Sequence, residues 1–170
     1  MEKQVKSKQR GADHGEVFTA NNQTLWKLLQ WLLLIIVVAI ILYGTILSRS
    51  PKADYSYNLN LFWSYKAWFH GNISVGDQII RNILMFIPFG FLFSVCIDDG
   101  VKKVGKVFGL AVLVSFVFSV GIELCQLIFR LGFCELDDVI NNTLGGAIGS
   151  GVYLLVRKIK AYIFEKRDRK

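Results

Sequence analysis

An apolar run near the amino end is the feature that most constrains this chain. From Leu28 to Ser48 no charged residue occurs, and almost every side chain is apolar. A bilayer core about 30 Å thick is crossed by about 20 helical residues, so this run predicts a membrane-spanning helix. The run is longer than the apolar part of a signal peptide, and no small-residue cleavage site follows it. We therefore expect the helix to be retained.

Three further apolar segments follow, and hydrophobic residues make up 53% of the chain. This exceeds the share usual in soluble domains, and the excess lies in blocks. We predict an all-α polytopic membrane protein whose four transmembrane helices pack as a small bundle in one domain, residues 25–156. The predicted spans are residues 25–48, 78–97, 107–129 and 139–156.

The basic residues predict the orientation of the spans. A flexible basic tail is expected over residues 1–24 and a second basic tail, with seven Lys and Arg, over 157–170. The loop with Lys102, Lys103 and Lys106 lies on the same side of the membrane as both tails. By the positive-inside rule, both termini are expected in the cytoplasm. The formal net charge of +7 is thereby explained without nucleic acid as a partner; the expected partner is the lipid bilayer.

The segment between the first two spans, residues 49–77, is rich in aromatic residues. Aromatic rings with polar tips favour the headgroup level of a membrane. We expect a short interfacial helix around Leu59–Phe69, followed by a turn at Gly71, Asn72 and Gly76. The sequence does not define the conformation of the rest of this loop.

Polar residues on three predicted spans fall at one depth below the outer membrane surface. Glu123, Gln126 and Arg130 are spaced i, i+3 and i+7, so they share one helix face. Charged side chains within a membrane usually mark function. The predicted polar cluster comprises Arg81, Asn82, Glu123, Gln126, Arg130, Asp137, Asp138, Asn141 and Asn142. Close helix packing is predicted at Gly90, Gly145 and Gly149, with a kink at Pro88.

Each of these residues also has a structural interpretation. Asp137 or Asp138 is expected to cap the fourth span, and Asn141 and Asn142 could join neighbouring helices. A buried Glu123 needs a cation, for which Arg81 and Arg130 are the candidates. Neither a metal site nor a cofactor is predicted, because Cys96, Cys125 and Cys134 have neither the spacing nor a nearby His for a metal.

Two blocks of sequence resemble the VanZ-like family of small bacterial membrane proteins. One block is RNILMFIPFG at residues 81–90. The other is Glu123-x-x-Gln126 followed by LDDVINNTLGGAIG at residues 136–149. The resemblance implies a multi-pass protein of the bacterial cell membrane that is linked to resistance to teicoplanin and related lipid-tailed glycopeptides. Family members often have Asp where this chain has Glu135, so no role is assigned to that position.

Three mechanisms are compatible with the pattern. In the first, an outward-facing polar pocket binds a lipoglycopeptide or a lipid-linked envelope precursor. In the second, an intramembrane enzyme uses Glu123 and Asp138 as acid and base, with Arg81 or Arg130 stabilising an anion. In the third, the cluster serves only structure or partner binding. The first is favoured, because the sequence has no GxSxG or HExxH motif and no Cys–His pair.

Overall fold

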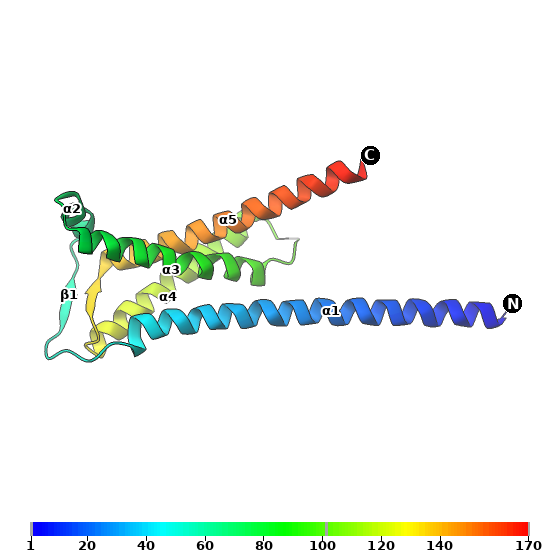
Figure 1. Cartoon of the computed structure of the whole chain (residues 1–170), viewed down its shortest axis with the longest axis horizontal. Helices are drawn as coiled ribbons and strands as arrows, with labels where there is room; N and C mark the ends of the chain where they lie inside the picture. Colours follow the sequence, from blue (N-terminus) through cyan, green and yellow to red (C-terminus); the bar gives the residue numbers. More distant parts are fainter. Residues whose placement is uncertain (1, 101, 170) are drawn as a thin grey trace.

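The computed structural model describes residues 2–100 and 102–169, and it consists mainly of long helices (Figure 1). The elements in chain order are α1 (Glu2–Leu42), the π-helix η1 (Tyr43–Leu47), β1 (Ser56–Asn58), α2 (Trp63–Phe69), α3 (Ile73–Ile97), α4 (Val104–Ile128), β2 (Phe133–Glu135) and α5 (Leu136–Asp168). Met1 and Lys170, the outer ends of the two predicted tails, lie outside the described residues.

Four helices are long and apolar enough to cross a membrane: α1 with η1, α3, α4 and α5. Their outward faces expose large apolar side chains, such as Leu32, Leu113 and Leu155, which are 52%, 56% and 58% exposed. A soluble protein rarely exposes so much contiguous apolar surface, whereas lipid accommodates it. The predicted fold class, an all-α protein with four spanning helices, is confirmed, with one small sheet added.

The helices extend beyond several of the predicted span limits. Helix α3 begins at Ile73 because the side chain of Asn72 caps it, accepting a hydrogen bond from Val75 N at 3.3 Å. Helix α5 continues to Asp168, so most of the predicted carboxyl tail is helical. Helix α1 likewise includes residues 2–24, which were predicted as a flexible tail. Lys, Gln, Glu and Ala favour helix, and an existing span supplies the nucleus. The mobility of this segment stays a prediction.

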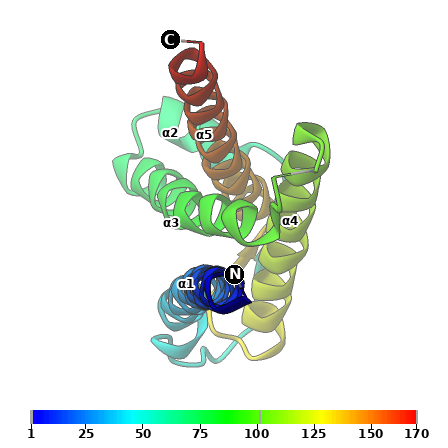
Figure 2. The same cartoon turned by 90° about the vertical axis from the view of Figure 1, so that its right-hand side faces the viewer.

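Helix α5 packs against both α3 and α4, and α1 packs along α3. Figure 2 views the bundle from the side of the termini and shows α3 between α1 and α5. Three aromatic rings fill the centre: the ring centroid of Phe118 lies 5.7 Å from that of Phe86 and 5.2 Å from that of Phe89. Leu34 and Ile41 of α1 join this core.

Glycines allow α3 and α5 to approach at backbone distance. A Cβ on Gly145 would collide with the carbonyl oxygen of Ile83, and one on Gly149 with that of Ile87. A Cβ on Gly90 would meet the backbone of Gly146 in the same way. The structure thus places these glycines where the small-residue spacing predicted close packing. Pro88 lies inside the continuous helix α3 and is exposed; a kink there stays a prediction.

Both termini lie at one end of the molecule, and the strands and α2 lie at the other (Figure 1). At that second end β1 pairs with β2 in parallel, with Tyr57 opposite Cys134. The predicted interfacial helix is present but shorter, since α2 begins at Trp63. The predicted turn is correct for Gly71, which has φ +92°. It is wrong for Gly76, which lies inside α3, where the Trp68 ring packs directly over it and leaves no room for a Cβ.

Candidate functional site

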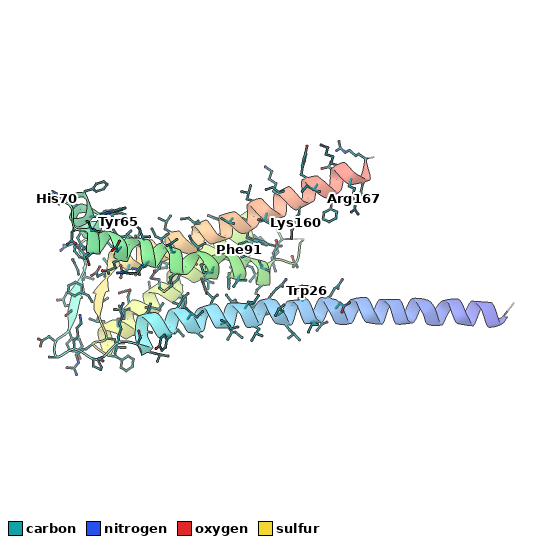
Figure 3. The ribbon with its side chains drawn as sticks, viewed as in Figure 1. Trp26, Tyr65, His70, Phe91, Lys160 and Arg167 are labelled. Atoms are coloured by element: carbon teal, nitrogen blue, oxygen red, sulfur yellow. The ribbon has the colours of Figure 1, made fainter. Side chains whose placement is uncertain are left out.

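A polar cavity of about 440 Å³ lies at the end of the molecule opposite the termini, which we call the pocket end. Figure 3 shows this end, which also contains Tyr65 of α2 and His70, the residue directly after α2. The walls come from the loop after η1, the first half of α3, and the β2 strand with its flanks. The cavity is lined by Arg49, Ser50, Lys52, Gln78, Arg81, Asn82, Leu131, Gly132, Phe133, Glu135 and Asp138.

The pocket carries charges of both signs. Its basic residues are Arg49, Lys52 and Arg81, and its acidic residues are Glu135 and Asp138. Gln78 bridges the two acids: its Nε2 donates to Asp138 Oδ2 at 3.2 Å and to Glu135 Oε2 at 3.4 Å. Since Glu135 and Asp138 are buried and the three basic residues lie near the surface, the pocket has an acidic floor and a basic rim.

A π-turn at the end of the first span positions Arg49. Ser48 N donates to Tyr43 O at 2.9 Å, and the Thr45 hydroxyl donates to Ile41 O at 2.7 Å. Such π-turns often occur at functional sites. The Arg49 guanidinium then lies over Gly132, where any Cβ would collide with its Nη1. The absence of a side chain at residue 132 therefore lets Arg49 reach the pocket wall.

Glu123 is buried beneath the pocket, not in its lining. It is 4% exposed, and its Oε2 accepts a hydrogen bond from the backbone N–H of Glu135 at 3.0 Å. The predicted pairing with Arg81 or Arg130 is not formed, because no ion pair among residues 22–100 and 102–169 involves Glu123. The carboxylate of Glu123 thus holds β2 against α4, which shapes the pocket floor.

Two of the predicted polar residues join neighbouring elements. Gln126 Nε2 donates to Thr45 O at 3.2 Å, which ties α4 to η1. Asn142 Nδ2 donates to the Ser119 hydroxyl at 2.8 Å, which ties α5 to α4. Their amides replace hydrogen bonds that water would supply outside a membrane. The structure therefore gives Asn142 the interhelical role that the sequence left open.

Asp137 and Asn141 hold α2 on the bundle. The Asp137 side chain is fully buried and accepts from Phe62 N at 2.6 Å, Ser64 N at 2.9 Å and Ser64 Oγ at 2.6 Å. The Tyr65 hydroxyl donates to Asn141 Oδ1. Asp137 thus caps α2 across the fold, and not its own helix, whose N-cap is Glu135. The burial of Tyr65 beside Asp137 raises the pKa of its phenol.

Burial also changes the acidity of two residues of β2, the strand at the pocket floor. Removal of Glu135 from water, reinforced by the negative charges of Asp138 and Asp137, raises the pKa of its carboxyl to about 7, although Arg49 opposes the shift. Burial raises the pKa of the neighbouring Cys134 thiol as well. Within the part of the chain that the structure describes, no three His, Cys, Asp or Glu side chains are placed to hold a metal ion.

Arg130 does not share the face of Glu123 and Gln126, as its spacing predicted. Helix α4 ends at Ile128, and Arg130 adopts φ +56°, so the i+7 relation is broken. Its side chain instead donates to Ala53 O at 3.1 Å and lies 5.3 Å from the Tyr55 ring centroid. Arg130 therefore anchors the loop before β1 and takes no part in the pocket.

Three of the nine predicted residues line the pocket: Arg81, Asn82 and Asp138. The pocket also contains Arg49, Lys52, Gln78 and Glu135, to which the sequence gave no role. One available signal was position, since Arg49 immediately follows the first span and Gln78 precedes Arg81 by three residues on one helix face. Glu135 carried no such signal, because its burial depends on the pairing of β1 with β2.

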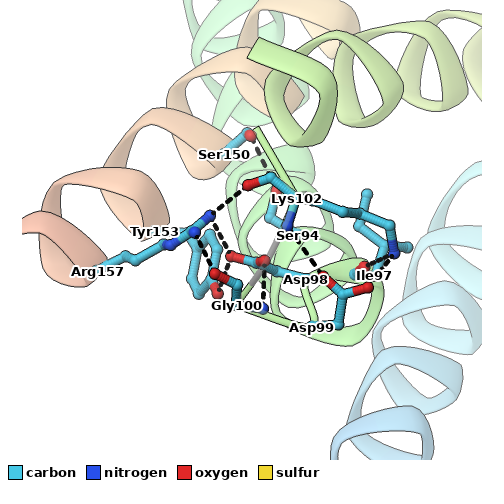
Figure 4. Close-up of polar contacts among 9 residues, drawn as sticks. All are labelled: Ser94, Ile97, Asp98, Asp99, Gly100, Lys102, Ser150, Tyr153 and Arg157. Carbon is cyan, nitrogen blue, oxygen red and sulfur yellow. Dashed lines mark hydrogen bonds and ion pairs between the residues drawn. The ribbon is translucent and has the colours of Figure 1, made fainter. Parts of the chain in front are cut away.

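A second polar network lies at the termini end (Figure 4). Arg157 Nη1 forms an ion pair with Asp98 Oδ2 at 2.8 Å, and the Tyr153 hydroxyl donates to the same oxygen at 2.8 Å. Closer to the middle of the bundle, the Ser94 hydroxyl donates to Ser150 Oγ at 2.8 Å. These contacts fix α5 to the end of α3, so the pocket helices are held together at both ends of the bundle.

The chain matches known proteins over most of its membrane-spanning part. Residues 29–157 match the family model described as VanZ/LLP1. The chain is similar to "Protein VanZ" of Enterococcus faecium, with 37% identity over 83 residues, which cover 48% of this chain and 47% of that protein. It thus spans about half the length of the curated relative that it matches. No solved structure matches the chain.

Proposed function

This chain belongs to the VanZ/LLP1 family, and on that premise we propose that it lowers the susceptibility of bacteria to lipid-tailed glycopeptides of the teicoplanin type. The family relation supports a link to glycopeptide resistance. We further propose that the protein acts in the bacterial cell membrane, with the pocket end facing outward. There the pocket binds the headgroup of an amphiphile, either the lipoglycopeptide itself or a lipid-linked envelope precursor.

The mixed charge of the pocket is the observation that carries this proposal. Arg49 and Arg81 present planar guanidinium groups that bind carboxylates and phosphates through paired hydrogen bonds. Glu135 and Asp138 present acceptors for amines and sugar hydroxyls. A headgroup with both kinds of group, as in glycopeptides and lipid-linked sugars, satisfies both sets of partners. A cavity of about 440 Å³ falls in the size range of small-molecule sites.

The surface beside the pocket suits a lipid tail. Ile80 and Leu84 flank Arg81 on α3 and are 43% and 58% exposed. These side chains face outward from the bundle, where an acyl chain would run in the bilayer. A ligand with its headgroup at Arg81 would therefore keep its tail in lipid. This arrangement favours tailed glycopeptides over those without a tail.

A susceptibility assay in bacteria tests the proposal. We expect the wild-type protein to raise the inhibitory concentration of teicoplanin, but not that of a glycopeptide without a lipid tail. Arg81→Gln should abolish most of this protection at unchanged membrane abundance. Lys66→Gln is the matched control, because Lys66 is an exposed cation on α2 at the same end but outside the pocket. Full protection by Arg81→Gln, or equal protection against both drugs, would refute the proposal.

One observation favours an enzymatic alternative at the same site. A Glu135 carboxyl with a pKa of about 7, next to the second carboxyl Asp138, is suited to proton transfer at neutral pH. The variant Glu135→Gln separates the two mechanisms, because it keeps shape and hydrogen bonding but removes proton transfer. Normal ligand binding with lost protection would indicate catalysis, whereas retained protection would indicate binding alone.

A further inference from the structure

We propose that a groove at the termini end is a binding site for an anionic phospholipid of the membrane leaflet on that side. The groove has a volume of about 480 Å³ and lies between the start of α4 and the projecting part of α5. Its lining is mostly apolar and includes two cations, Arg157 and Lys158. The lining residues are Val104, Leu154, Leu155, Arg157, Lys158 and Ala161. It lies at the opposite end of the bundle from the pocket, so this inference does not depend on the proposed function.

Helix geometry places the groove at the membrane surface. Helix α5 has 33 residues and is therefore about 50 Å long at 1.5 Å per residue, whereas a bilayer core is about 30 Å thick. From Leu136 at the pocket end, a rise of about 30 Å reaches Arg157. Figure 1 shows α5 projecting past the ends of α3 and α4 beyond this level, as α1 also does. The apolar wall of the groove therefore lies in the bilayer and its cations at the headgroups.

The balance of charge at the groove is positive. The two acids between α3 and α4 are already paired, Asp98 with Arg157 at 2.8 Å and Asp99 with Lys102 at 3.3 Å (Figure 4). Farther along α5, Glu165 pairs with Arg169. Among the side chains described, those of residues 22–100 and 102–169, no ion pair involves Lys158, nor Lys103 and Lys106 near the start of α4. These three lysines leave an excess of positive charge at the rim. That excess complements a net-negative headgroup and not a zwitterionic one.

The apolar wall selects a lipid over a soluble anion. Leu155 is 58% exposed, and Val104 on the facing helix is 56% exposed. Arg157 turns its guanidinium toward the loop before α4, where Nη2 donates to Gly100 O at 2.9 Å. Its aliphatic stem therefore remains as wall, and Lys158 supplies the charge. An acyl chain along Leu154 and Leu155 beneath a phosphate at Lys158 would fill both parts of the groove.

Native mass spectrometry of the full-length protein in detergent tests this inference. Phosphatidylglycerol and phosphatidylcholine with identical acyl chains are added in steps, and the fraction of protein with one bound lipid is followed. We expect saturable binding of phosphatidylglycerol, at least about fivefold tighter than that of phosphatidylcholine, and about fivefold weakening by Lys158→Gln, the effect of one basic residue at an anionic headgroup. Lys160→Gln is the control, because Lys160 is an exposed cation two residues away that does not line the groove.

A second variant tests the apolar half. Ala161→Phe would fill the groove without changing its charge, and the exposed position tolerates the larger ring. We expect it to reduce phosphatidylglycerol binding as much as Lys158→Gln does. Equal binding of the two lipids, or equal effects of Lys158→Gln and Lys160→Gln, would overturn the inference, since either result indicates general adsorption. Unchanged binding by Ala161→Phe would also overturn it. Inorganic phosphate that competes at millimolar concentration would show an anion site without a lipid.

Discussion

At the scale of single residues, Glu135 connects the fold to the chemistry of the pocket. Its backbone N–H is held by Glu123, and its side chain shares Gln78 with Asp138. The Arg49 guanidinium opposes the repulsion among these acids. Near neutral pH, the loss of a proton from Glu135 therefore adds one negative charge to the pocket floor.

The raised pKa of Glu135 predicts that stability falls as pH rises. The folded protein holds this proton up to about pH 7, whereas an unfolded Glu releases it near pH 4.5. Between these values the folded state binds more protons, so unfolding becomes easier with rising pH, by at most about 1.4 kcal/mol per pH unit. Thermal unfolding in detergent from pH 5 to pH 8 measures this slope.

Replacement of Glu135 by Gln should reduce that slope. Asp77→Asn is the control, because Asp77 is an exposed acid on α3 outside the pocket. If Glu135→Gln melts with the same pH dependence as the wild type, Glu135 is not the group that titrates.

Sequence reasoning found the polar positions better than it found their partners. Helical spacing within one span placed Gln126 and Asn142 on inward faces, where the structure has them buried. It did not find Asp137 capping α2, or Arg49 lying over Gly132, because these contacts join residues more than seventy positions apart. Such contacts depend on how the loop after the first span folds back, which has no periodic signal.

At the scale of elements, the contact between α3 and α5 is made through glycine. The backbone neighbours of Gly149 are Ile87 O and Phe91 N, and neither moves without displacing α3. We expect Gly149→Ala to destabilise the protein by about 1–3 kcal/mol through overpacking. Gly151→Ala is the matched control on the same helix, since nothing lies within 4 Å of a Cβ there.

The measurement for this pair is the midpoint of thermal unfolding together with membrane abundance. Gly149→Ala should lower both, while Gly151→Ala should match the wild type or exceed it, since Ala favours helix. Equal behaviour of the two variants would show that the close α3–α5 approach contributes little to stability.

The long helices and the short helix α2 could be predicted from sequence, and the two strands could not. Apolar runs of about 20 residues predict spans whatever their neighbours are. Strands β1 and β2 have three residues each, too few for an alternating pattern to stand out. Their pairing depends on the helices that bring Tyr57 and Cys134 together. The part of the pocket wall that β2 and its flanks form could not be predicted either, because it also depends on this pairing.

At the scale of the whole molecule, the two ends of the bundle differ in kind. The pocket end holds a polar cavity and an aromatic segment, and the termini end holds a lysine-rich rim. The positive-inside rule assigns the termini end to the cytoplasm, and this orientation remains a prediction. The proposed function uses it, because an amphiphile arriving from outside would meet the pocket first.

Labelling of single cysteines with a membrane-impermeant maleimide measures the orientation in intact cells. We expect Ser74→Cys, exposed in the first turn of α3, to react without permeabilisation. Lys160→Cys on the projecting part of α5 should react only after permeabilisation. The background carries Ala in place of Cys96, Cys125 and Cys134. The reverse labelling pattern would place the pocket in the cytoplasm.

Direct binding of teicoplanin to the purified protein in lipid nanodiscs tests the pocket itself, with titration calorimetry as the readout. We predict saturable binding to the wild type and to Lys66→Gln. The double variant Arg49→Gln/Arg81→Gln should bind at least about tenfold more weakly, since each lost charge-assisted pair contributes about 1.5–3 kcal/mol. Equal affinity for teicoplanin in the double variant and the wild type would contradict a ligand site between Arg49 and Arg81.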